Sequence, residues 1–424
     1  MGTFGPMDPP ASSGLASLAA DAGTALAPPL PVSLYVHVPF CVSKCAYCDF
    51  YSLPGHAERY AAFVDAALFE AGHWSHYDLL DDVPTLYFGG GTPTALGGEL
   101  VRLVGGILET ARVRPDAEIT VETNPEVTEP GIVGALVAAG VNRFSLGVQS
   151  FDDEVLRALG RCHDSSRAVA AAELLASSGC AFSLDLMCGV PGQSFESWDV
   201  TLERAVATGA RHISVYPLTI EAGTPLEKAI ALGLVPAPDP DVAAEMMLAA
   251  EVALAAEGLL RYEVANYAQP GHESRHNSVY WTGGAYLGVG PHAASMLPYP
   301  LMRRVADGEG WTLPDTSSDP TRVRFTREVS LDAYIRRPLA APVPFEVLSS
   351  EETERENVML GMRLREGVAV RYVEAARLTA VMERLADTGL VRRERDADGV
   401  ARWAVTQQGW LLGNEVFGSI WAGE

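Results

Sequence analysis

Residues 35–50 read Y-V-H-V-P-F-C-V-S-K-C-A-Y-C-D-F and place three cysteines, Cys41, Cys45 and Cys48, directly after a run typical of a β-strand. Three thiolates at this spacing can hold three irons of a [4Fe–4S] cluster, because thiolate is the soft ligand that iron–sulfur chemistry selects. No fourth cysteine follows close by, so one iron would lack a protein ligand. An iron with an open position can bind a substrate or cofactor directly, and the triplet therefore predicts a reactive cluster.

Two other kinds of site fit the triplet less well. Structural zinc wants four ligands, usually as two separated pairs, and only His37 lies nearby. A disulfide is disfavoured because three clustered cysteines cannot all pair and no feature indicates secretion. Cys162 and Cys180 are expected to be ordinary buried thiols, and Cys188 follows a predicted strand near the expected pocket.

Length, charge and the first residues limit the class of protein. The length of 424 residues predicts two or three domains. The sequence has no run of eighteen apolar residues, so no membrane span is expected. A formal net charge of −23 argues against a nucleic-acid partner, whose binding depends largely on neutralising phosphates. Residues 1–31 are rich in Ala, Pro, Gly and Ser and hold no Lys or Arg, which predicts a disordered extension and not a signal peptide. We therefore expect a cytoplasmic protein, in a compartment where thiols stay reduced.

Short β-rich runs alternate with longer amphipathic stretches from about residue 33. The predicted strands are 33–38, 85–90, 118–122, 143–148, 182–187 and 212–217, and the predicted helices are 57–71, 98–111, 130–139, 164–178 and 196–207. Gly140, Gly179 and Gly209 stand where helices are expected to end. Six βα units in a row predict an α/β fold with a parallel sheet and outer helices, a partial (β/α)6 TIM-like barrel that is two units short of closure.

Distinctive residues fall at the carboxyl ends of these strands, where chemistry gathers in barrels of this type. The cysteine loop follows the first predicted strand and G-G-G-T-P (89–93) follows the second. Glu122 closes the third, Gln149 follows the fourth, and Asp185 lies on the fifth. Since the ends of parallel strands meet at one edge of a sheet, these residues are expected to form one site.

The remaining third of the chain has a different pattern. Residues 232–240 resemble a linker, 241–257 predict a helix, 261–296 are rich in glycine and aromatic residues, and 307–320 are loop-like. A helical segment is expected from about 350, followed over 378–420 by a helix, two short strands (391–395 and 401–405) and a final helix. This order predicts a small winged-helix-like α+β module. Winged helices often bind DNA, but the net negative charge of the chain argues against that function here.

The cysteine triplet, the G-G-G-T-P loop and the six βα units together resemble the radical S-adenosylmethionine (SAM) superfamily. The resemblance is detailed over roughly 33–296, and the C-terminal segment is similar to the accessory domain of one subgroup. It implies that the amino and carboxylate groups of SAM chelate the open iron and that an electron from the cluster cleaves the sulfonium C–S bond. The cofactor then carries the hard chemistry, while the protein orients it and excludes water.

The same resemblance implies roles for single residues. Gly90, Gly91 and Thr92 match the motif that lets backbone approach the methionine part of SAM, for which glycine suits because it lacks a Cβ. Taken alone, G-G-G-T-P is also compatible with a tight turn. The other residues that match cofactor contacts are Tyr35, Tyr47, Glu122, Gln149, Arg161 and Asp185. Their side chains suit a zwitterionic ligand with hydroxyls, although each alone is equally consistent with a salt bridge or a strand cap.

Two features distinguish between subgroups with this core. Anaerobic coproporphyrinogen III oxidases have the pattern C-x3-C-x2-C-x-C, whereas this chain has Phe50 in place of the fourth cysteine and so resembles the HemW-like heme chaperones. H-N-S-V-Y-W (276–281) resembles an H-N-x-x-Y-W pattern that is linked to heme binding in HemW-like proteins. His276 can ligate heme iron, and Tyr280 and Trp281 offer flat apolar surface to a macrocycle. A surface loop with a satisfied histidine is the alternative.

The resemblance therefore implies a heme chaperone that binds a [4Fe–4S] cluster, SAM and heme and delivers heme to an acceptor protein. Oxygen-independent oxidation of coproporphyrinogen III is the alternative activity. The expected partners are a heme-acceptor protein, an electron donor and, through peripheral contact, membrane-bound respiratory enzymes, with no nucleic acid. The expected division is an extension (1–31), a radical SAM core (32–270), a heme-motif region and linker (271–345) and an accessory domain (346–424).

Overall fold

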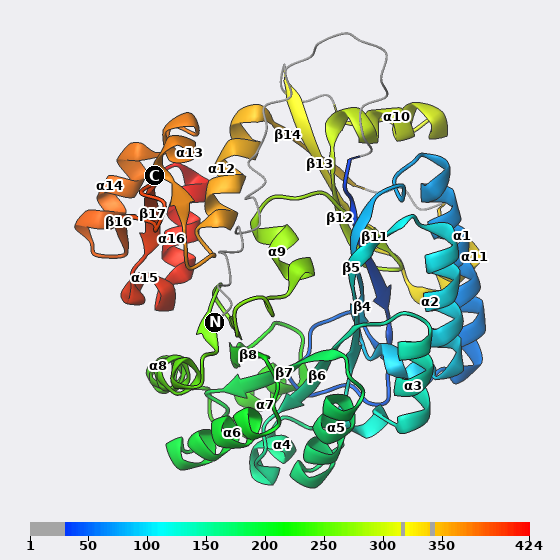
Figure 1. The fold of residues 1–424 in the computed structure, drawn as a ribbon, viewed down its shortest axis with the longest axis horizontal. Helices are drawn as coiled ribbons and strands as arrows, with labels where there is room; N and C mark the ends of the chain where they lie inside the picture. The colour runs from blue at the N-terminus through cyan, green and yellow to red at the C-terminus, as the bar shows by residue number, and fades with distance from the viewer. Residues whose placement is uncertain (1–29, 315–318, 340–343) are drawn as a thin grey trace, which may run out of the picture.

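A computed structural model describes residues 30–314, 319–339 and 344–424. Almost all of the expected disordered extension (1–31) lies outside the described residues. Within them, the order of helices and strands follows the predicted alternation along the chain (Figure 1).

All six predicted strands form and lie side by side in parallel. They are β1 (Ser33–Val38), β4 (Val83–Gly90), β5 (Val113–Thr123), β6 (Arg143–Gln149), β7 (Ala181–Cys188) and β8 (His212–Pro217). The helices between them cover the outer face of the sheet (Figure 1) and are α1 (Tyr60–His76), α2 (Gly98–Thr110), α3 (Pro130–Ala138), α4 (Asp153–Ala158), α5 (Ser165–Ser177) and α6 (Phe195–Ala207). The predicted α/β class with an open parallel sheet is confirmed.

Local sequence explains where these helices begin and end. The side chains of Asp164 and Ser194 accept hydrogen bonds from backbone N–H groups of the first turns of α5 and α6, which satisfies donors that a helix leaves free. Gly140, Gly179 and Gly209, predicted to end helices, all have positive φ (108°, 79° and 77°). Glycine enters this left-handed region without the steric cost of a Cβ, so the chain can turn from each helix into the next strand.

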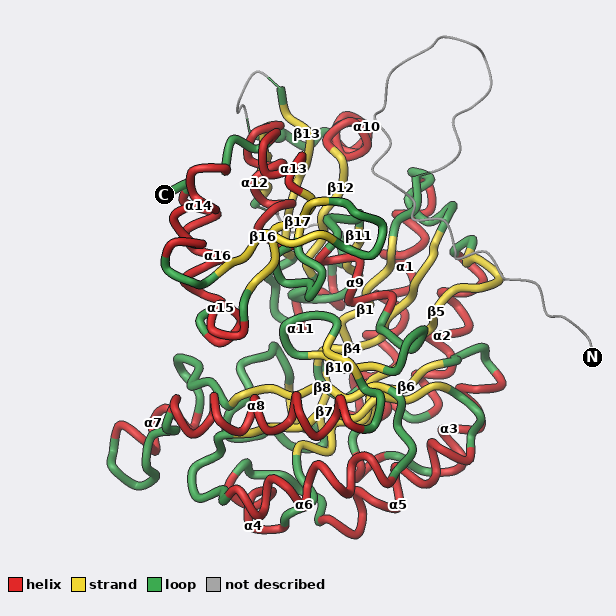
Figure 2. Tube along the Cα trace, turned by 60° about the vertical axis from the view of Figure 1, so that its left-hand side comes forward, coloured by secondary structure: helices red, strands yellow, loops and turns green. Residues whose placement is uncertain are grey.

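The sheet extends further than the sequence predicted. β11 (Tyr286–Val289) pairs in parallel with β1, and the antiparallel strands β12 (Ala294–Pro298), β13 (Pro320–Thr326) and β14 (Phe345–Ser349) follow beyond it. At the other edge β10 (Asn266–Ala268) and β9 (Leu260–Arg261) are added, giving twelve strands in one open row (Figure 2). The glycine- and aromatic-rich region was not resolved into strands from sequence because runs of two to five residues show no clear period.

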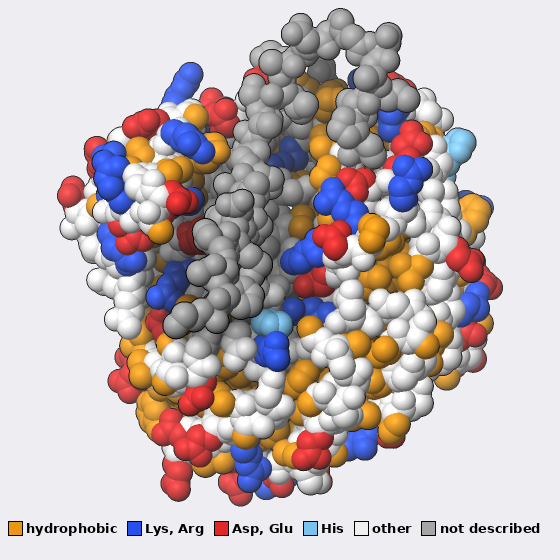
Figure 3. All heavy atoms as spheres, in the orientation of Figure 1, with side chains coloured by type: hydrophobic (Ala, Val, Ile, Leu, Met, Phe, Trp, Pro, Cys, Tyr) orange, Lys and Arg blue, Asp and Glu red, His pale blue; other side chains and the backbone are white. Residues whose placement is uncertain are grey.

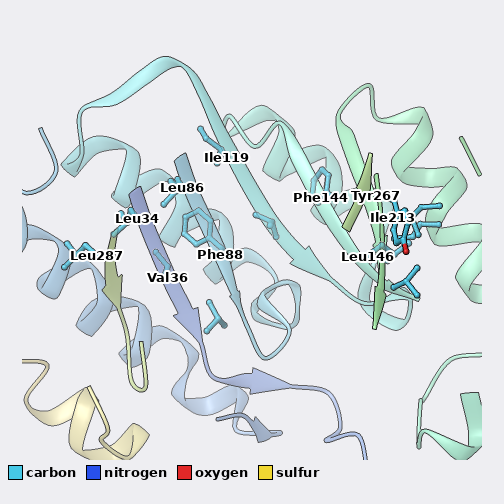
Figure 4. Packing of buried hydrophobic residues seen from close by; sticks show 14 of the residues in the cluster. Leu34, Val36, Leu86, Phe88, Ile119, Phe144, Leu146, Ile213, Tyr267 and Leu287 are labelled. Atoms are coloured by element: carbon cyan, nitrogen blue, oxygen red, sulfur yellow. The ribbon is translucent and has the colours of Figure 1, made fainter. Parts of the chain in front are cut away.

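The main hydrophobic core lies between the sheet and its outer helices. Leu34, Val36, Leu86, Phe88 and Phe144 point from neighbouring strands into this layer and are fully buried (Figure 4). Because successive side chains of a strand point to opposite faces, the alternate residues face the interior of the partial barrel. Many of those inward residues are polar, which leaves the interior free to form a site.

Three further helices lie close to the barrel. α7 (Pro225–Ala231) and α8 (Pro240–Ala256) follow β8, and α9 (Arg275–Trp281) lies between β10 and β11 in the chain. α10 (Tyr299–Glu309) and α11 (Leu331–Arg336) accompany the antiparallel strands. The short η helices are η1 (Ala57–Arg59), η2 (Pro93–Leu96) and η3 (Pro125–Val127). None of the helices in the described ranges is long and apolar enough to cross a membrane.

The C-terminal segment forms a small α+β module with the predicted pair of strands. Its elements are α12 (Ser350–Gly361), β15 (Val368–Ala369), α13 (Val370–Ala375), α14 (Thr379–Asp387), β16 (Val391–Arg395), β17 (Ala401–Val405), α15 (Gln407–Leu411) and α16 (Gly413–Ala422). Arg322 and Arg324 of β13 both pair with Glu356 of α12 and connect this module to the sheet. On the face shown in Figure 3, Lys and Arg side chains are interspersed with Asp and Glu, so the visible surface carries no continuous basic band.

Candidate functional site

The cysteine loop is held at its base by a short pair of parallel strands. β2 (Phe40–Cys41) pairs with β3 (Leu53–Pro54), and the backbone N–H of Leu53 donates to Pro39 O at 2.8 Å. Cys41 is buried, whereas Cys45 and Cys48 are partly exposed, and all three residues line one cavity of about 450 Å³. No group of three described His, Cys, Asp or Glu side chains converges to hold a single metal ion. A [4Fe–4S] cluster makes no such demand, because each thiolate binds a different iron.

A chain of hydrogen bonds links two of the three cysteines. Thr92 Oγ1 donates to Cys41 Sγ at 3.6 Å and accepts from Asn124 Nδ2 at 2.7 Å. Arg161 Nη2 donates to Asn124 Oδ1 at 2.8 Å, and Arg161 Nη1 donates to Cys45 Sγ at 3.3 Å. Hydrogen bonds to the ligand sulfurs orient them and stabilise negative charge on the thiolates.

The glycines after β4 are fitted tightly against the segment that carries the cysteines. A Cβ on Gly90, whose φ is 110°, would lie 2.5 Å from the ring of His37, and one on Gly91 would lie 2.4 Å from Phe40 O. The backbone N–H of Gly91 donates to Val38 O at 2.9 Å. Glycine is therefore required here by contact with β1 and β2, in addition to leaving the backbone of Gly90 and Gly91 on the cavity wall.

Two carboxyl groups lie on neighbouring parts of the sheet, Glu122 one residue before the end of β5 and Asp185 within β7. Glu122 accepts from Tyr87 Oη at 2.7 Å and from the backbone N–H of Gly90 at 3.0 Å. Burial, with a smaller contribution from Asp185, raises the pKa of Glu122 from 4.5 to about 7. Burial also raises the pKa of Asp185, whose Oδ2 accepts from Ser145 at 3.1 Å. Glu122 can therefore hold a proton near neutral pH, and both groups can accept hydrogen bonds from a ligand.

Gln149 occupies an uncommon backbone conformation at the end of β6. Its φ is 66°, in the left-handed region that residues with a side chain seldom adopt. The residue lines the cavity, so the strained backbone directs a long amide side chain toward the site. Tyr47 also lines the cavity and packs against the small apolar cluster that includes Leu159 and Leu226.

The cavity brings together most of the residues that the sequence singled out. Its lining includes the following predicted residues: Cys41, Cys45, Tyr47, Cys48, Gly90, Gly91, Thr92, Glu122, Gln149, Arg161 and Asp185. Tyr35, His276, Tyr280 and Trp281 are not among the lining residues. Tyr35 lies behind Tyr87, with ring centroids 6.1 Å apart, and its Oη is 3.0 Å from His37 Nδ1.

His276 lies inside the protein, on α9, which packs against β4 of the barrel. It is 1% exposed, with Nδ1 2.8 Å from Thr85 Oγ1 and Nε2 2.9 Å from Tyr280 Oη. Glu118 of β5 holds this end of α9 by accepting from the backbone N–H of Arg275 and His276 at 3.2 and 2.9 Å. Burial lowers the pKa of His276 to about 3, so its imidazole is neutral at physiological pH.

Trp281 at the end of α9 contacts the C-terminal module. The guanidinium of Arg363 lies 4.9 Å from the Trp281 ring and 4.6 Å from the Phe417 ring, so one cation contacts an aromatic side chain of each part. Tyr280 packs against Tyr286 of β11 at 4.8 Å. The motif 276–281 therefore connects the interior of the barrel, the added strand and the module.

Several residues of the site were missed from sequence. Asn124 comes directly after β5, two positions after Glu122, and its backbone is still extended, so the alternation of side chains along the strand could have indicated it. Tyr87 on β4 and Tyr216 on β8 also line the cavity. The expectation that Cys162 is buried is wrong: its thiol is exposed and lies 2.6 Å from Ser43 Oγ of the cysteine loop, because it follows Arg161 at the rim of the cavity.

Comparisons with known proteins agree with this geometry. The family model described as "Radical SAM superfamily" matches residues 35–205, which span the cysteine loop and the strands up to β7. A solved structure of coproporphyrinogen III oxidase (HemN) from Escherichia coli, a radical SAM enzyme, superposes with a TM-score of 0.73 over 93% of this chain and 91% of that one. At 22% identity this likeness shows a shared fold.

Curated relatives extend over nearly the whole chain. The heme chaperone HemW of Mycobacterium tuberculosis is 35% identical over 413 residues, covering 93% of this chain and 96% of that protein. The heme chaperone HemW of Synechocystis is 30% identical over 426 residues, covering 93% and 97%. This extent of similarity shows that the chain belongs to the HemW family of radical SAM proteins.

Proposed function

We propose that the protein is a heme chaperone, which binds a [4Fe–4S] cluster, SAM and heme and transfers heme to an acceptor protein. The observation that carries the proposal is the similarity to proteins named heme chaperone HemW over 93% of this chain. Phe50 supports it, since its exposed ring, at the position where the oxidase pattern has a fourth cysteine, offers no metal ligand.

The cysteine loop fits the cluster by its chemistry. Cys41, Cys45 and Cys48 are all free thiols on the wall of one cavity, and Thr92 and Arg161 donate hydrogen bonds to two of the sulfurs. We propose these cysteines as the three protein ligands, which leaves one iron open to SAM. When bound, the cluster supplies the electron that can cleave the sulfonium bond of SAM.

The cavity beside the loop fits a zwitterionic ligand. Glu122 and Asp185 offer carboxyl oxygens for hydroxyl or ammonium groups, and Arg161, whose buried Nε has no partner among the described residues, offers a cation for a carboxylate. Gly90, Gly91 and Thr92 leave space for the ligand along one wall. We propose that these residues hold SAM together with Tyr47 and Gln149. Tyr35, which does not line the cavity, would support the site through its stacking on the Tyr87 ring.

His276, Tyr280 and Trp281 are the proposed heme contacts. The imidazole of His276 is neutral, as an iron ligand must be, but each of its nitrogens lies within hydrogen-bond distance of a protein hydroxyl. Ligation of iron by His276 therefore requires that Nε2 leave Tyr280 or that Nδ1 leave Thr85. The proposal thus includes a rearrangement around α9 when heme binds.

The proposal includes partners, compartment and division of the chain. An acceptor protein receives the heme, and an electron donor reduces the cluster. The protein acts in the cytoplasm and delivers heme through peripheral contact with membrane-bound respiratory enzymes. We assign cluster and SAM to a core of residues 32–270, heme to the region 271–345, and an accessory role to residues 346–424.

Titration with hemin tests the function. The purified chain, with and without a reconstituted cluster, is expected to give a saturable Soret band, and His276→Ala is expected to change its position or weaken binding. His56→Ala, which removes an exposed histidine, is the control. Absence of a Soret band would remove heme binding from the proposal, whereas an unchanged band in His276→Ala would remove only His276 as a ligand.

Anaerobic turnover tests the alternative activity. The cluster-loaded protein is supplied with SAM, a reductant and coproporphyrinogen III, and we expect no substantial formation of protoporphyrinogen. Substantial product would favour the oxidase over the chaperone.

A further inference from the structure

The cavity that contains the proposed SAM contacts also includes a polar part of the barrel interior, called the chamber here. Residues from β5 to β8 that face inward there are small or polar, including Thr120, Ser145, Ser183 and Ser214, and all line the cavity. Barrels of this type usually fill their interior with bulky branched side chains. Small polar side chains in their place leave room for a ligand and present hydrogen-bonding groups to it.

Three buried polar atoms in this chamber have no hydrogen-bond partner among the described residues: Thr120 Oγ1, Arg143 Nη2 and His212 Nδ1. Thr120, Arg143 and His212 are 1%, 5% and 2% exposed, and all three line the cavity. Thr120 is the direct neighbour of Arg143 in the pairing of β5 with β6. A buried polar group without a partner is costly, so native proteins normally satisfy such groups with protein, water or ligand. We call these three residues the basal donor set.

The charge of Arg143 is only partly compensated by the protein. Its Nη1 donates to His272 O at 3.2 Å and lies 3.7 Å from Glu118 Oε2. Glu118 is shared, because its two oxygens also accept from the backbone of α9 at Arg275 and His276. Nη2 of Arg143 therefore has no acceptor among the described residues, on a side chain that lines the cavity.

His212 offers a second donor to the same space. Its Nε2 lies 2.9 Å from Tyr262 Oη, and that hydroxyl accepts from the backbone N–H of Ser274 at 3.2 Å. The hydroxyl of Tyr262 can donate its proton to His212 Nε2, and in that tautomer Nδ1 carries the ring proton and is a donor. Burial, and to a lesser degree Arg143, lowers the pKa of His212 well below its usual value, so the ring stays neutral.

We propose that the basal donor set binds the carboxylate of a small ligand, in a subsite of the same cavity formed by residues other than the proposed SAM contacts. A guanidinium N–H, an imidazole N–H and a hydroxyl together match the acceptor atoms of a carboxylate. Arg143 is the one cation of the set and also interacts with Asp185 of the same cavity, so the subsite suits a monoanion better than a phosphate dianion. The carboxylate belongs either to a free monocarboxylic acid or to a propionate group of heme, and only the second source depends on the proposed function.

Thermal unfolding of the full chain with its cluster, in increasing sodium propionate, tests the subsite. A ligand that binds only the folded state raises the melting temperature in a saturable way, and sodium chloride at equal ionic strength controls for salt. Thr120→Val keeps the shape and removes a hydroxyl that has no described protein partner, so it should fold normally. We expect its half-saturation to rise about fivefold, as for one hydrogen bond, and Thr120→Ser to restore it.

Arg143→Gln should abolish the saturable rise. The proposal is overturned if the wild-type protein responds to propionate no more than to chloride, as expected for a chamber that holds only water. It is also overturned if Thr120→Val and Arg143→Gln both titrate like the wild type. Hemin titration in the presence of propionate identifies the source: competition assigns the subsite to a heme propionate, and its absence assigns it to a free acid. Failure of the thermal test leaves the Soret titration, and hence the chaperone proposal, unaffected.

Discussion

Nη1 of Arg161 donates a hydrogen bond to Sγ of Cys45 at 3.3 Å, across 116 positions of the sequence. The contact brings a cation from the segment after α4 against one proposed cluster ligand. Through Asn124 and Thr92 the same guanidinium is connected to Cys41. Donors and positive charge near a ligand sulfur stabilise the reduced, more negative cluster.

Replacement of Arg161 should therefore make the cluster harder to reduce. We expect Arg161→Met to shift the reduction potential by roughly 60 mV to more negative values, equivalent to a tenfold change for a one-electron couple. Arg161→Lys keeps the positive charge but cannot make both guanidinium hydrogen bonds, so its potential should lie between those of the wild type and Arg161→Met. A redox titration followed by electron paramagnetic resonance measures the shift. Arg157→Met, which removes an exposed arginine of α4, is the control, and equal potentials in all four proteins would contradict the prediction.

Asn124 should matter for assembly of the site. Asn124→Ala removes one of the partners of Thr92 Oγ1 and of Arg161 Nη2, and we expect a loss of about 1–2 kcal/mol in unfolding free energy because each polar group loses a hydrogen bond. Iron and sulfide content after reconstitution should fall in parallel. Chemical denaturation and iron analysis measure the two effects. Full stability together with full iron content would show that the hydrogen-bond chain is dispensable.

SAM affinity should depend on the ionisation of Glu122. Since burial raises the pKa of Glu122 to about 7, its carboxylate is present above pH 7 and is lost as the pH falls below it. If the carboxylate attracts the cationic ligand, affinity should fall about tenfold from pH 8 to pH 6, the change in the ionised fraction. Calorimetry at both pH values checks this. Glu122→Gln should bind more weakly and lose the pH dependence, and a variant that keeps the same slope would exclude Glu122 as its source.

The strained backbone at Gln149 predicts that a residue better suited to this conformation will make the protein more stable but bind SAM less tightly. Asparagine tolerates the left-handed region better than glutamine, so Gln149→Asn should raise the unfolding free energy by about 1 kcal/mol. Its shorter side chain should weaken SAM binding. Arg377→Asn, at another residue with positive φ (58°), should raise stability without changing SAM affinity. An unaltered affinity in Gln149→Asn would mean that the amide does not reach the ligand.

Tyr280 should restrain His276 in the heme-free protein. Tyr280→Phe removes the hydroxyl that lies 2.9 Å from Nε2 and keeps the ring, so less is lost when iron binds that nitrogen. We expect hemin to bind about fivefold more tightly, as for the release of one hydrogen bond. Tyr286→Phe, at the ring packed against Tyr280, is the control. Weaker binding in Tyr280→Phe would instead indicate that the hydroxyl itself contacts heme.

The sequence by itself determined the six βα units, the place of the cysteine loop and the residues at the strand ends. Those features follow from local period, from turn residues such as Gly140 and Gly179, and from adjacency along the chain. Glu122, Gln149 and Asp185 were expected to meet because parallel strands end at one edge, and all three line the same cavity.

Only the tertiary structure decided what touches what across long separations. It pairs β11 with β1, joins Asn124 to Arg161 and encloses His276 within reach of Thr85 and Tyr280. It also leaves the three atoms of the basal donor set without a partner among the described residues. These relations depend on strand order, side-chain direction and burial, which no local pattern encodes. A histidine in a recognisable motif and a histidine with both ring nitrogens occupied are identical in sequence, and packing alone separates them.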